Sequence, residues 1–295
     1  MSENKKFFDS NFLKKLELLT LVSKRIRAGQ TKGERKSIKR GHSLEFADYR
    51  NYSRGDDLRY LDWNIYGRLD KLFIKLFAEE EDLHIHILMD SSKSMEFGNP
   101  VKLDYAKRVA GALGYIGLAN YDAVGVGSFS GQLGSSVPPM RSKARVFQLF
   151  DFISNIHSDG ETQFNRSIRE YAGRQTKPGT AIVISDFLDP AGYEDGLRHL
   201  LSRRYEIFVL QILSPEEIDP PYRGDLKLVD SENNTFREVT ISERVMKRYK
   251  ETLSHYCAQL QNFCRTRGII YLRTSTSVPF EDLILKYLTK SGVLT

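Results

Sequence analysis

The residues whose types and spacing could bind a metal ion lie in the segment HIHILMDSSKSMEFG, residues 84–98. A strand-like apolar run ends at Asp90, and two serines follow at alternate positions, Ser92 and Ser94. Asp-x-Ser-x-Ser on a short turn can direct three hard oxygen atoms to one side of a Mg²⁺ or Mn²⁺ ion. One carboxylate and two hydroxyls leave such an ion under-neutralised, so further oxygen ligands must come from other parts of the chain.

Two further oxygen-bearing residues occur at suitable positions. Thr162 lies in the segment DGETQFNRS, and Asp186 follows an apolar run in VISDF. Ligands of doubly wound sheets bind beyond the carboxyl ends of the strands, where we expect Asp90 and Asp186. A helix cap is the alternative interpretation of the serine-rich turn, but Thr162 and Asp186 favour a metal site. A vacant coordination position at that ion would accept an Asp or Glu side chain from a protein partner.

Strands that alternate with helices are expected to position these residues. The expected strands cover 83–90, 122–130, 180–187, 206–213 and 268–275, and the expected helices cover 101–121, 142–157, a short stretch after Gln163, 191–204, 243–266 and 279–291. This alternation predicts an α/β fold with a Rossmann-like, parallel-rich sheet and helices on both faces. Residues 225–242 alternate with period two and predict an inserted β-hairpin. We expect this domain to span residues 81–295.

The first 80 residues form the predicted accessory segment, with a helix over 8–28, a basic loop and a strand-like LFIKLF run. Residues 24–40 hold eight Lys or Arg and one Glu, whereas the whole chain has a net charge of +6. Such a stretch could bind nucleic acid, an anionic lipid surface or an acidic protein surface. A solvated arm is the simpler interpretation, so nucleic-acid binding stays an alternative that we do not favour.

A second region of the accessory segment mixes aromatic and charged residues. Residues 49–68 interleave four tyrosines with four arginines, a mixture that could bind single-stranded nucleic acid. Four aspartates lie among or directly beside these residues, at positions 48, 56, 57 and 62. Internal Arg–Asp pairing and packing of the sole tryptophan, Trp63, is therefore the simpler interpretation. We therefore expect residues 41–82 to form a small subdomain.

The motifs of several enzyme classes are missing from the sequence. A phosphatase of the aspartyl-phosphate type needs a second acid two residues after Asp90, where this chain has Ser92. Neither the Gly-x-Ser-x-Gly elbow of serine hydrolases nor the P-loop motif Gly-x4-Gly-Lys-Ser/Thr occurs. Metal-dependent hydrolysis remains an alternative, although no residue is evident as its general base. We therefore expect a protein without enzymatic activity.

Two pairs of potential metal ligands have simpler structural interpretations. His84 and His86 share one face of a strand, but no third ligand lies nearby in the sequence, so we interpret them as sheet-packing residues. Cys257 and Cys264 stand seven residues apart in a predicted helix, which favours two reduced side chains on its buried face. Neither pair adds to the predicted metal site.

The five candidate ligands together resemble a known constellation. Asp90, Ser92, Ser94, Thr162 and Asp186 match the metal-ion-dependent adhesion site of the von Willebrand factor A fold, in which such residues gather one Mg²⁺. The segments EFADYR (45–50), GDDLRYLDW (55–63) and LVDSENNTFREV resemble the bacterial family called domain of unknown function 58. This resemblance covers roughly residues 35–290.

The resemblance implies a function through partners. Members of that family are associated with MoxR-type AAA+ ATPases and are regarded as adaptors or assembly factors without an assigned enzymatic activity. Many relatives carry membrane helices, but this sequence has no apolar run of the roughly 20 residues that a span needs, nor a signal peptide. We therefore expect a cytoplasmic protein that binds Mg²⁺ or Mn²⁺ and a partner such as a MoxR-type ATPase.

Overall fold

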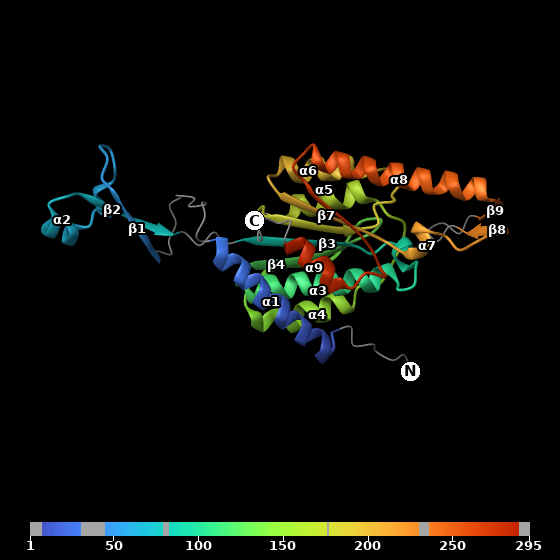
Figure 1. Cartoon of the computed structure of the whole chain (residues 1–295), viewed down its shortest axis with the longest axis horizontal. Coiled ribbons are helices and arrows are strands. Elements are labelled where there is room, and N and C mark those ends of the chain that lie inside the picture. Colours follow the sequence, from blue (N-terminus) through green and yellow to red (C-terminus); the bar gives the residue numbers. More distant parts are fainter. Residues whose placement is uncertain (1–7, 31–44, 79–82, 176, 230–235, 289–295) are drawn as a thin grey trace. The chain divides into compact units, whose positions relative to one another are not determined.

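The computed structural model describes residues 8–30, 45–78, 83–175, 177–229 and 236–288 of the 295-residue chain. The chain divides into two compact units (Figure 1). The larger unit comprises Met1–Ala28 and Leu83–Thr295, and the smaller unit comprises Gly29–Asp82. The five candidate ligands all belong to the larger unit.

Six strands of the described larger unit form one sheet in the order β10-β7-β6-β3-β4-β5. Their bounds are β3 (His84–Asp90), β4 (Ala123–Phe129), β5 (Leu133–Met140), β6 (Thr180–Ser185), β7 (Glu206–Leu213) and β10 (Ile270–Ser275). Neighbouring strands are parallel from β10 through to β4, and only the β4–β5 pair is antiparallel. The predicted α/β class with a parallel-rich sheet is confirmed.

Strand β5 was not expected from the sequence. Its residues, LGSSVPPM, include Pro138 and Pro139, which lack the backbone N–H that a central strand must donate. An edge strand tolerates proline because one of its sides has no neighbouring strand. β5 lies at the edge of the sheet, and most of its side chains are exposed or half-buried.

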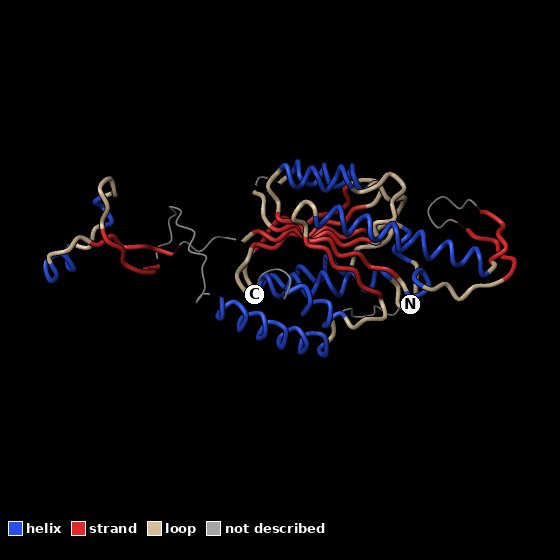
Figure 2. Tube along the Cα trace, turned by 45° about the horizontal axis from the view of Figure 1, so that its top comes forward, coloured by secondary structure: helices blue, strands red, loops and turns tan. Residues whose placement is uncertain are grey.

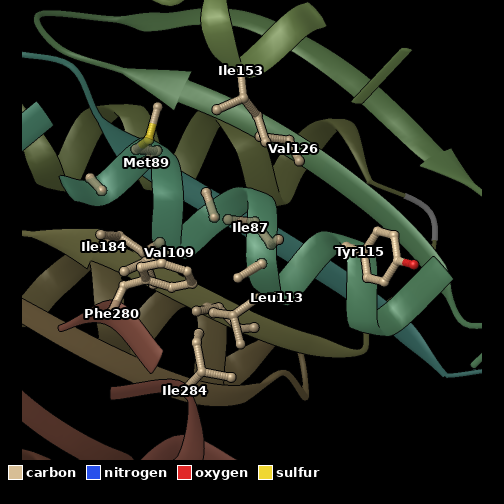
Figure 3. Close-up of a cluster of buried hydrophobic side chains, with 14 of the residues drawn as sticks. Ile87, Met89, Val109, Leu113, Tyr115, Val126, Ile153, Ile184, Phe280 and Ile284 are labelled. Carbon is tan, nitrogen blue, oxygen red and sulfur yellow. The ribbon is translucent and has the colours of Figure 1, made fainter. Parts of the chain in front are cut away.

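Helices cover both faces of the sheet (Figure 2). One face packs against α1 (Ser10–Gln30), α3 (Lys102–Ala119), α4 (Val146–Ser154) and α9 (Phe280–Leu288), and the other packs against α5 (Phe164–Arg174), α6 (Glu194–Ser202) and α8 (Glu243–Arg265). Successive strand side chains point to opposite faces, so Ile87 and Met89 contact the first layer (Figure 3) and Leu88 contacts the second. The short helices η2 (Lys93–Glu96), η3 (Lys143–Arg145) and α7 (Pro215–Ile218) lie in the connections. β3 is thus buried on both sides.

The N-terminal helix α1 differs from the predicted grouping, which placed it in an accessory segment of residues 1–80. Most of the helix belongs to the larger unit, where Phe12 contacts Phe280 with ring centroids 5.1 Å apart. Lys15 forms an ion pair with Glu281 at 2.5 Å, and Leu16 is fully buried. The apolar side of the helix is therefore part of the main hydrophobic core.

The described part of the smaller unit contains β1 (Glu45–Asn51), η1 (Leu58–Tyr60), α2 (Trp63–Leu69) and β2 (Phe73–Ala78), and β1 pairs antiparallel with β2. The guanidinium of Arg50 donates two hydrogen bonds to the carboxylate of Asp56, both of 2.6 Å. Arg59 pairs with Asp57 at 2.6 Å. The predicted Arg–Asp pairing is confirmed.

The predicted packing of Trp63 is wrong. This side chain is 63% exposed at the first position of α2, and its ring meets only the edge of Tyr66 among the aromatic contacts of the described residues, at 6.2 Å. A hairpin with one seven-residue helix offers no opposing layer to cover a tryptophan. Leu58 and Leu69 of the same unit are likewise more than half exposed, at 56% and 61%.

The inserted hairpin predicted over 225–242 is present. Its strands β8 (Gly224–Val229) and β9 (Phe236–Ile241) pair antiparallel, and residues 230–235 lie outside the described part of the chain. The helix α8 follows, with Cys257 and Cys264 buried and not bonded to each other. The interpretation of both cysteines as reduced core residues is confirmed.

The basic stretch of residues 24–40 falls largely outside the described residues. Its first part forms the end of α1, and residues 31–40 are not described. The nucleic-acid hypothesis for this stretch therefore stays a prediction. None of the helices in the described ranges combines the length and the apolar character that crossing a bilayer requires.

Candidate metal centre at the carboxyl edge of the sheet

Two neighbouring parallel strands deliver the candidate carboxylates to the same edge of the sheet. β3 ends at Asp90, and β6 ends at Ser185, directly before Asp186. Because β3 and β6 pair in parallel, their carboxyl ends meet at one edge, as the sequence pattern predicted. All three side chains are almost fully buried, with relative exposures of 0%, 1% and 2%.

The carboxylate of Asp90 organises the turn that follows β3. One of its oxygens accepts the backbone N–H of Ser92 at 2.9 Å, and the other accepts the hydroxyl of Ser185 at 2.6 Å. Ser92 occupies the N-cap position of η2, yet its hydroxyl makes no capping hydrogen bond to that helix. The Ser92 hydroxyl is therefore not used as the helix cap that was the alternative interpretation.

A chain of hydroxyls links this turn to Asp186. The Oγ atoms of Ser92 and Ser94 lie 3.0 Å apart, and Ser94 donates to Oδ2 of Asp186 at 3.0 Å. The other oxygen of Asp186 accepts the backbone N–H of Leu188 at 3.1 Å. Four of the five predicted ligands are thus joined through hydrogen bonds around the ends of β3 and β6.

The loop that carries Thr162 lies against the same turn. The backbone N–H of Lys93 donates to the carbonyl of Gly160 at 3.1 Å, and Asp159 donates to the carbonyl of Ser91 at 2.8 Å. Thr162 itself is half-buried. The structure therefore brings the Thr162 loop beside the Asp-x-Ser-x-Ser turn, as the sequence order predicted.

Two charged residues of this site, Lys102 and Glu217, were not expected from the amino-acid sequence. The ammonium of Lys102 donates to Oδ2 of Asp186 at 2.7 Å and to Oε1 of Glu217 at 2.5 Å. The Lys102 side chain is fully buried, whereas that of Glu217 is 13% exposed. The site therefore contains its own positive charge between two carboxylates.

A weak signal for Lys102 does exist in the sequence. Lys102, Ala106, Val109 and Leu113 follow the spacing of one face of a helix, and the last three are buried core residues. A lysine on the apolar face of a helix must find a counter-ion, because a buried unpaired charge is costly. Nothing comparable in the sequence marks Glu217 as that counter-ion.

Burial and charge shift the titration of both key residues. Burial and, to a smaller extent, the negative charge of Asp186 together raise the pKa of Asp90 to about 7, although the hydrogen bonds from Ser185 and Ser92 lower it. Burial lowers the pKa of Lys102, but the carboxylates of Asp186 and Glu217 together outweigh it, so its pKa lies above the ordinary value. A positive ion beside Asp90 would strongly favour its ionised form.

The donor atoms suit a hard cation. Carboxylate and hydroxyl oxygens, supplemented by water, are the ligands that Mg²⁺ and Mn²⁺ prefer in proteins. Within the described ranges, no three His, Cys, Asp or Glu side chains gather closely enough to hold a metal without such hydroxyls. A metal at this site would therefore depend on Ser92 and Ser94 as well as on Asp90.

The amino-acid sequence is similar to that of a mycobacterial protein. An uncharacterized protein of Mycobacterium tuberculosis (strain ATCC 25618 / H37Rv) is 24% identical over 208 residues, which is 68% of this chain and 65% of that protein. The match thus spans less than two thirds of that relative's length.

Two solved structures show similarity at low sequence identity. The conserved hypothetical protein BatB from Bacteroides thetaiotaomicron has 18% identity and a TM-score of 0.46, over 70% of this chain and 98% of that chain. The SpRpn10 VWA domain has 9% identity and a TM-score of 0.41, over 70% of this chain and 94% of that chain. The family model described as "Protein of unknown function DUF58" matches residues 48–257, which is well over half of the sequence. The chain therefore belongs to the DUF58 family.

Proposed function

We propose that this chain is a non-enzymatic protein-binding adaptor that depends on a divalent cation. The convergence of Asp90, Ser92, Ser94 and Asp186 at the carboxyl ends of β3 and β6 is the observation that carries the proposal. Asp90, Ser92 and Ser94 would hold Mg²⁺ or Mn²⁺ directly, because they present three hard oxygens from one turn.

Thr162 and Asp186 would have supporting roles. Thr162 would complete the coordination of the ion in the engaged state, and the hydrogen bond from Lys93 to Gly160 holds its loop beside the turn. Asp186 would orient a coordinated water or ligate the ion. When bound, the ion would supply a coordination position for an Asp or Glu side chain of the partner.

The surroundings of the site support binding in place of catalysis. The carboxylate of Asp186 is engaged by Lys102, Ser94 and the backbone of Leu188. The histidines of β3 begin that strand, whereas Asp90 ends it. No histidine is therefore available at this edge from β3 as a general base.

The family resemblance supports the identity of the partner. DUF58 proteins are associated with MoxR-type AAA+ ATPases, so we propose such an ATPase as the protein that presents the acidic side chain. Binding between the two purified proteins should require Mg²⁺ or Mn²⁺ and should be lost when a chelator is added.

The metal site can be tested without the partner. Thermal and urea unfolding would be measured with and without millimolar Mg²⁺ or Mn²⁺ for wild type, Asp90→Asn and Asp90→Ala. A ligand at about 100 times its dissociation constant adds about 2.7 kcal/mol of stability. We expect this gain in wild type only, while the exposed-site control Asp151→Ala should respond like wild type.

Three results would contradict the proposal. Equal stabilisation of wild type and both Asp90 variants would place the metal elsewhere. Turnover of a generic phosphate ester that disappears in Asp90→Asn would indicate the hydrolase alternative. Binding of nucleic acid or anionic vesicles that falls steeply with salt and ignores the chelator would instead favour the basic stretch of residues 24–40.

A further inference from the structure

The first residue of α3 places a permanent positive charge inside the candidate metal centre. Lys102 is fully buried, and its ammonium lies between the carboxylates of Asp186 and Glu217 at 2.7 and 2.5 Å. A buried ammonium is stable only when it is paired and hydrogen-bonded. The two carboxylates satisfy this requirement without any metal ion.

Lys102 uses an oxygen that the metal site also needs. Oδ2 of Asp186 accepts both the ammonium of Lys102 and the hydroxyl of Ser94. The ammonium of Lys102 and the hydroxyl of Ser94, a proposed metal ligand, therefore share one acceptor atom. A fixed positive charge at this distance repels a divalent cation and occupies a lone pair of Asp186.

Glu217 can keep the ammonium in place when Asp186 is needed elsewhere. Its Oε2 accepts the backbone N–H of Ser214 at 2.7 Å, and its own backbone N–H donates to the Ser214 hydroxyl at 3.1 Å. Tyr249 donates to the backbone carbonyl of Glu217 at 2.8 Å. These bonds anchor Glu217 at the start of α7 independently of Asp186, and Oε1 remains directed at Lys102.

We propose that Lys102 is a built-in cation that neutralises this centre in the absence of metal and lowers its affinity for a divalent ion, with Glu217 as the acceptor that holds the ammonium when the ion engages Asp186. The proposal rests on the proposed function, because it concerns the same oxygen atoms. It assigns to Lys102 and Glu217 the control of when the centre binds metal.

The charges of the site show what this control would achieve. When ionised, Asp90, Asp186 and Glu217 carry three negative charges, which Lys102 and one divalent ion neutralise together. The loaded site then does not repel an incoming carboxylate, whereas a site without Lys102 would keep one excess negative charge. Lys102 thereby weakens metal binding and strengthens capture of the acidic partner, so metal and partner should bind cooperatively.

Mn²⁺ binding tests the proposal directly, with the free ion measured by electron paramagnetic resonance. Loss of the repelling charge in Lys102→Met should tighten Mn²⁺ binding about tenfold relative to wild type. Glu217→Gln, which leaves the ammonium with Asp186 alone, should weaken it by about the same factor. The double variant Lys102→Met/Glu217→Gln has the net charge of wild type, and it should still bind more tightly than wild type because no ammonium competes for Asp186.

The control and the possible outcomes separate this inference from the proposed function. Lys15→Met removes one positive charge from an ion pair with Glu281 and should leave Mn²⁺ affinity unchanged. If Lys102→Met does not fold, the comparison of Glu217→Gln with wild type decides. Wild-type Mn²⁺ binding that none of these variants alters would overturn the role of Lys102 while leaving the metal site intact. Absence of Mn²⁺ binding in every variant would overturn both proposals.

Discussion

The two ends of β3 both bury polar side chains, but they neutralise them in different ways. At the carboxyl end, Asp90 accepts hydrogen bonds from Ser92 and Ser185, and Lys102 supplies a positive charge to the adjacent Asp186. A buried ion pair between Lys102 and Asp186 is therefore retained at this end. Such a centre can exchange one partner for another, as ligand binding requires.

At the amino end of β3, the buried polar side chain of His86 is uncharged. His86 is fully buried between Tyr171 and Tyr205, with ring centroids 5.8 and 5.3 Å away, and its Nδ1 lies 3.0 Å from the Tyr171 hydroxyl. Burial and, to a smaller extent, neighbouring His84 together lower the pKa of His86 to about 4, so the ring is neutral at pH 7. This supports the interpretation of the two histidines as packing residues.

The two ends of β3 differ in whether a buried polar side chain keeps its charge. A buried residue that stays charged needs a counter-ion, and that counter-ion can be displaced by a ligand. A buried residue that gives up its charge needs only a hydrogen bond and a close fit. The following four experiments test this difference, beginning with the largest expected effect.

Removal of the internal counter-ion should cause the largest loss of stability. Lys102→Met leaves Asp186 and Glu217 buried without their shared cation, and breaking a buried pair costs about 3–5 kcal/mol. Urea unfolding in the presence of a chelator would measure the loss. Lys15→Met breaks a more exposed pair and should cost less than about 1 kcal/mol. Equal losses in the two variants would show that the buried charge is not held as described.

The neutral state of His86, at the amino end of β3, should make the folding stability depend on pH. Unfolded chains bind the His86 proton near the ordinary pKa of 6.5, and the folded state binds it only near 4. Between these values the unfolded state holds more protons, so stability falls as the pH drops, by up to about 3 kcal/mol. His86→Gln should remove this part of the decline, whereas exposed His255→Gln should not. Parallel stability–pH curves for wild type and His86→Gln would argue against a neutral His86.

A smaller effect is expected at the hydroxyl that joins the two strand ends. Ser185 donates to Asp90 at 2.6 Å and accepts the backbone N–H of Phe187 at 2.9 Å. Ser185→Ala leaves both of these buried groups without that partner, which costs about 1–3 kcal/mol in denaturant unfolding. Ser202→Ala, at an exposed helix end, serves as the matched control and should change stability by less than about 0.5 kcal/mol. A Ser185→Ala variant as stable as this control would mean that Asp90 is held by its other contacts.

The smallest effect is expected for the hydrogen bond at the amino end. Tyr171→Phe removes the hydroxyl beside Nδ1 of His86 but keeps the ring that packs on it. Loss of one neutral hydrogen bond costs about 0.5–1.5 kcal/mol. Calorimetry would measure this change in the free energy of unfolding. A loss of stability as large as that of Lys102→Met would contradict the proposed difference between the two ends of β3.

Much of the candidate centre could be predicted from local sequence. Asp90 and Asp186 follow apolar runs that read as strands, and Ser92 and Ser94 have the alternate spacing of a turn that faces one side. Their connection by hydrogen bonds follows from the parallel pairing of β3 and β6. Lys102 and Glu217 escaped prediction because their ion pair joins residues 115 positions apart.

Two other differences have the same origin. The strand β5 contains two prolines, and only its place at the sheet edge makes them acceptable. Trp63 was expected to be packed because tryptophan is large and apolar, yet its small unit offers no layer to cover it. In both cases the neighbouring elements, and not the residue type alone, determine whether the residue lies in a strand or is buried.

The alternation of strands and helices, the ends of the buried strands and the oxygen-bearing residues placed there can all be recognised in the amino-acid sequence. These features depend on the spacing of apolar residues and on turn residues, which are local along the chain. The role of Lys102 as the counter-ion of the centre and the neutral state of His86 follow from the folded arrangement alone. Burial and charge pairing depend on distances between remote segments, and these distances exist only once the sheet and its helices have assembled.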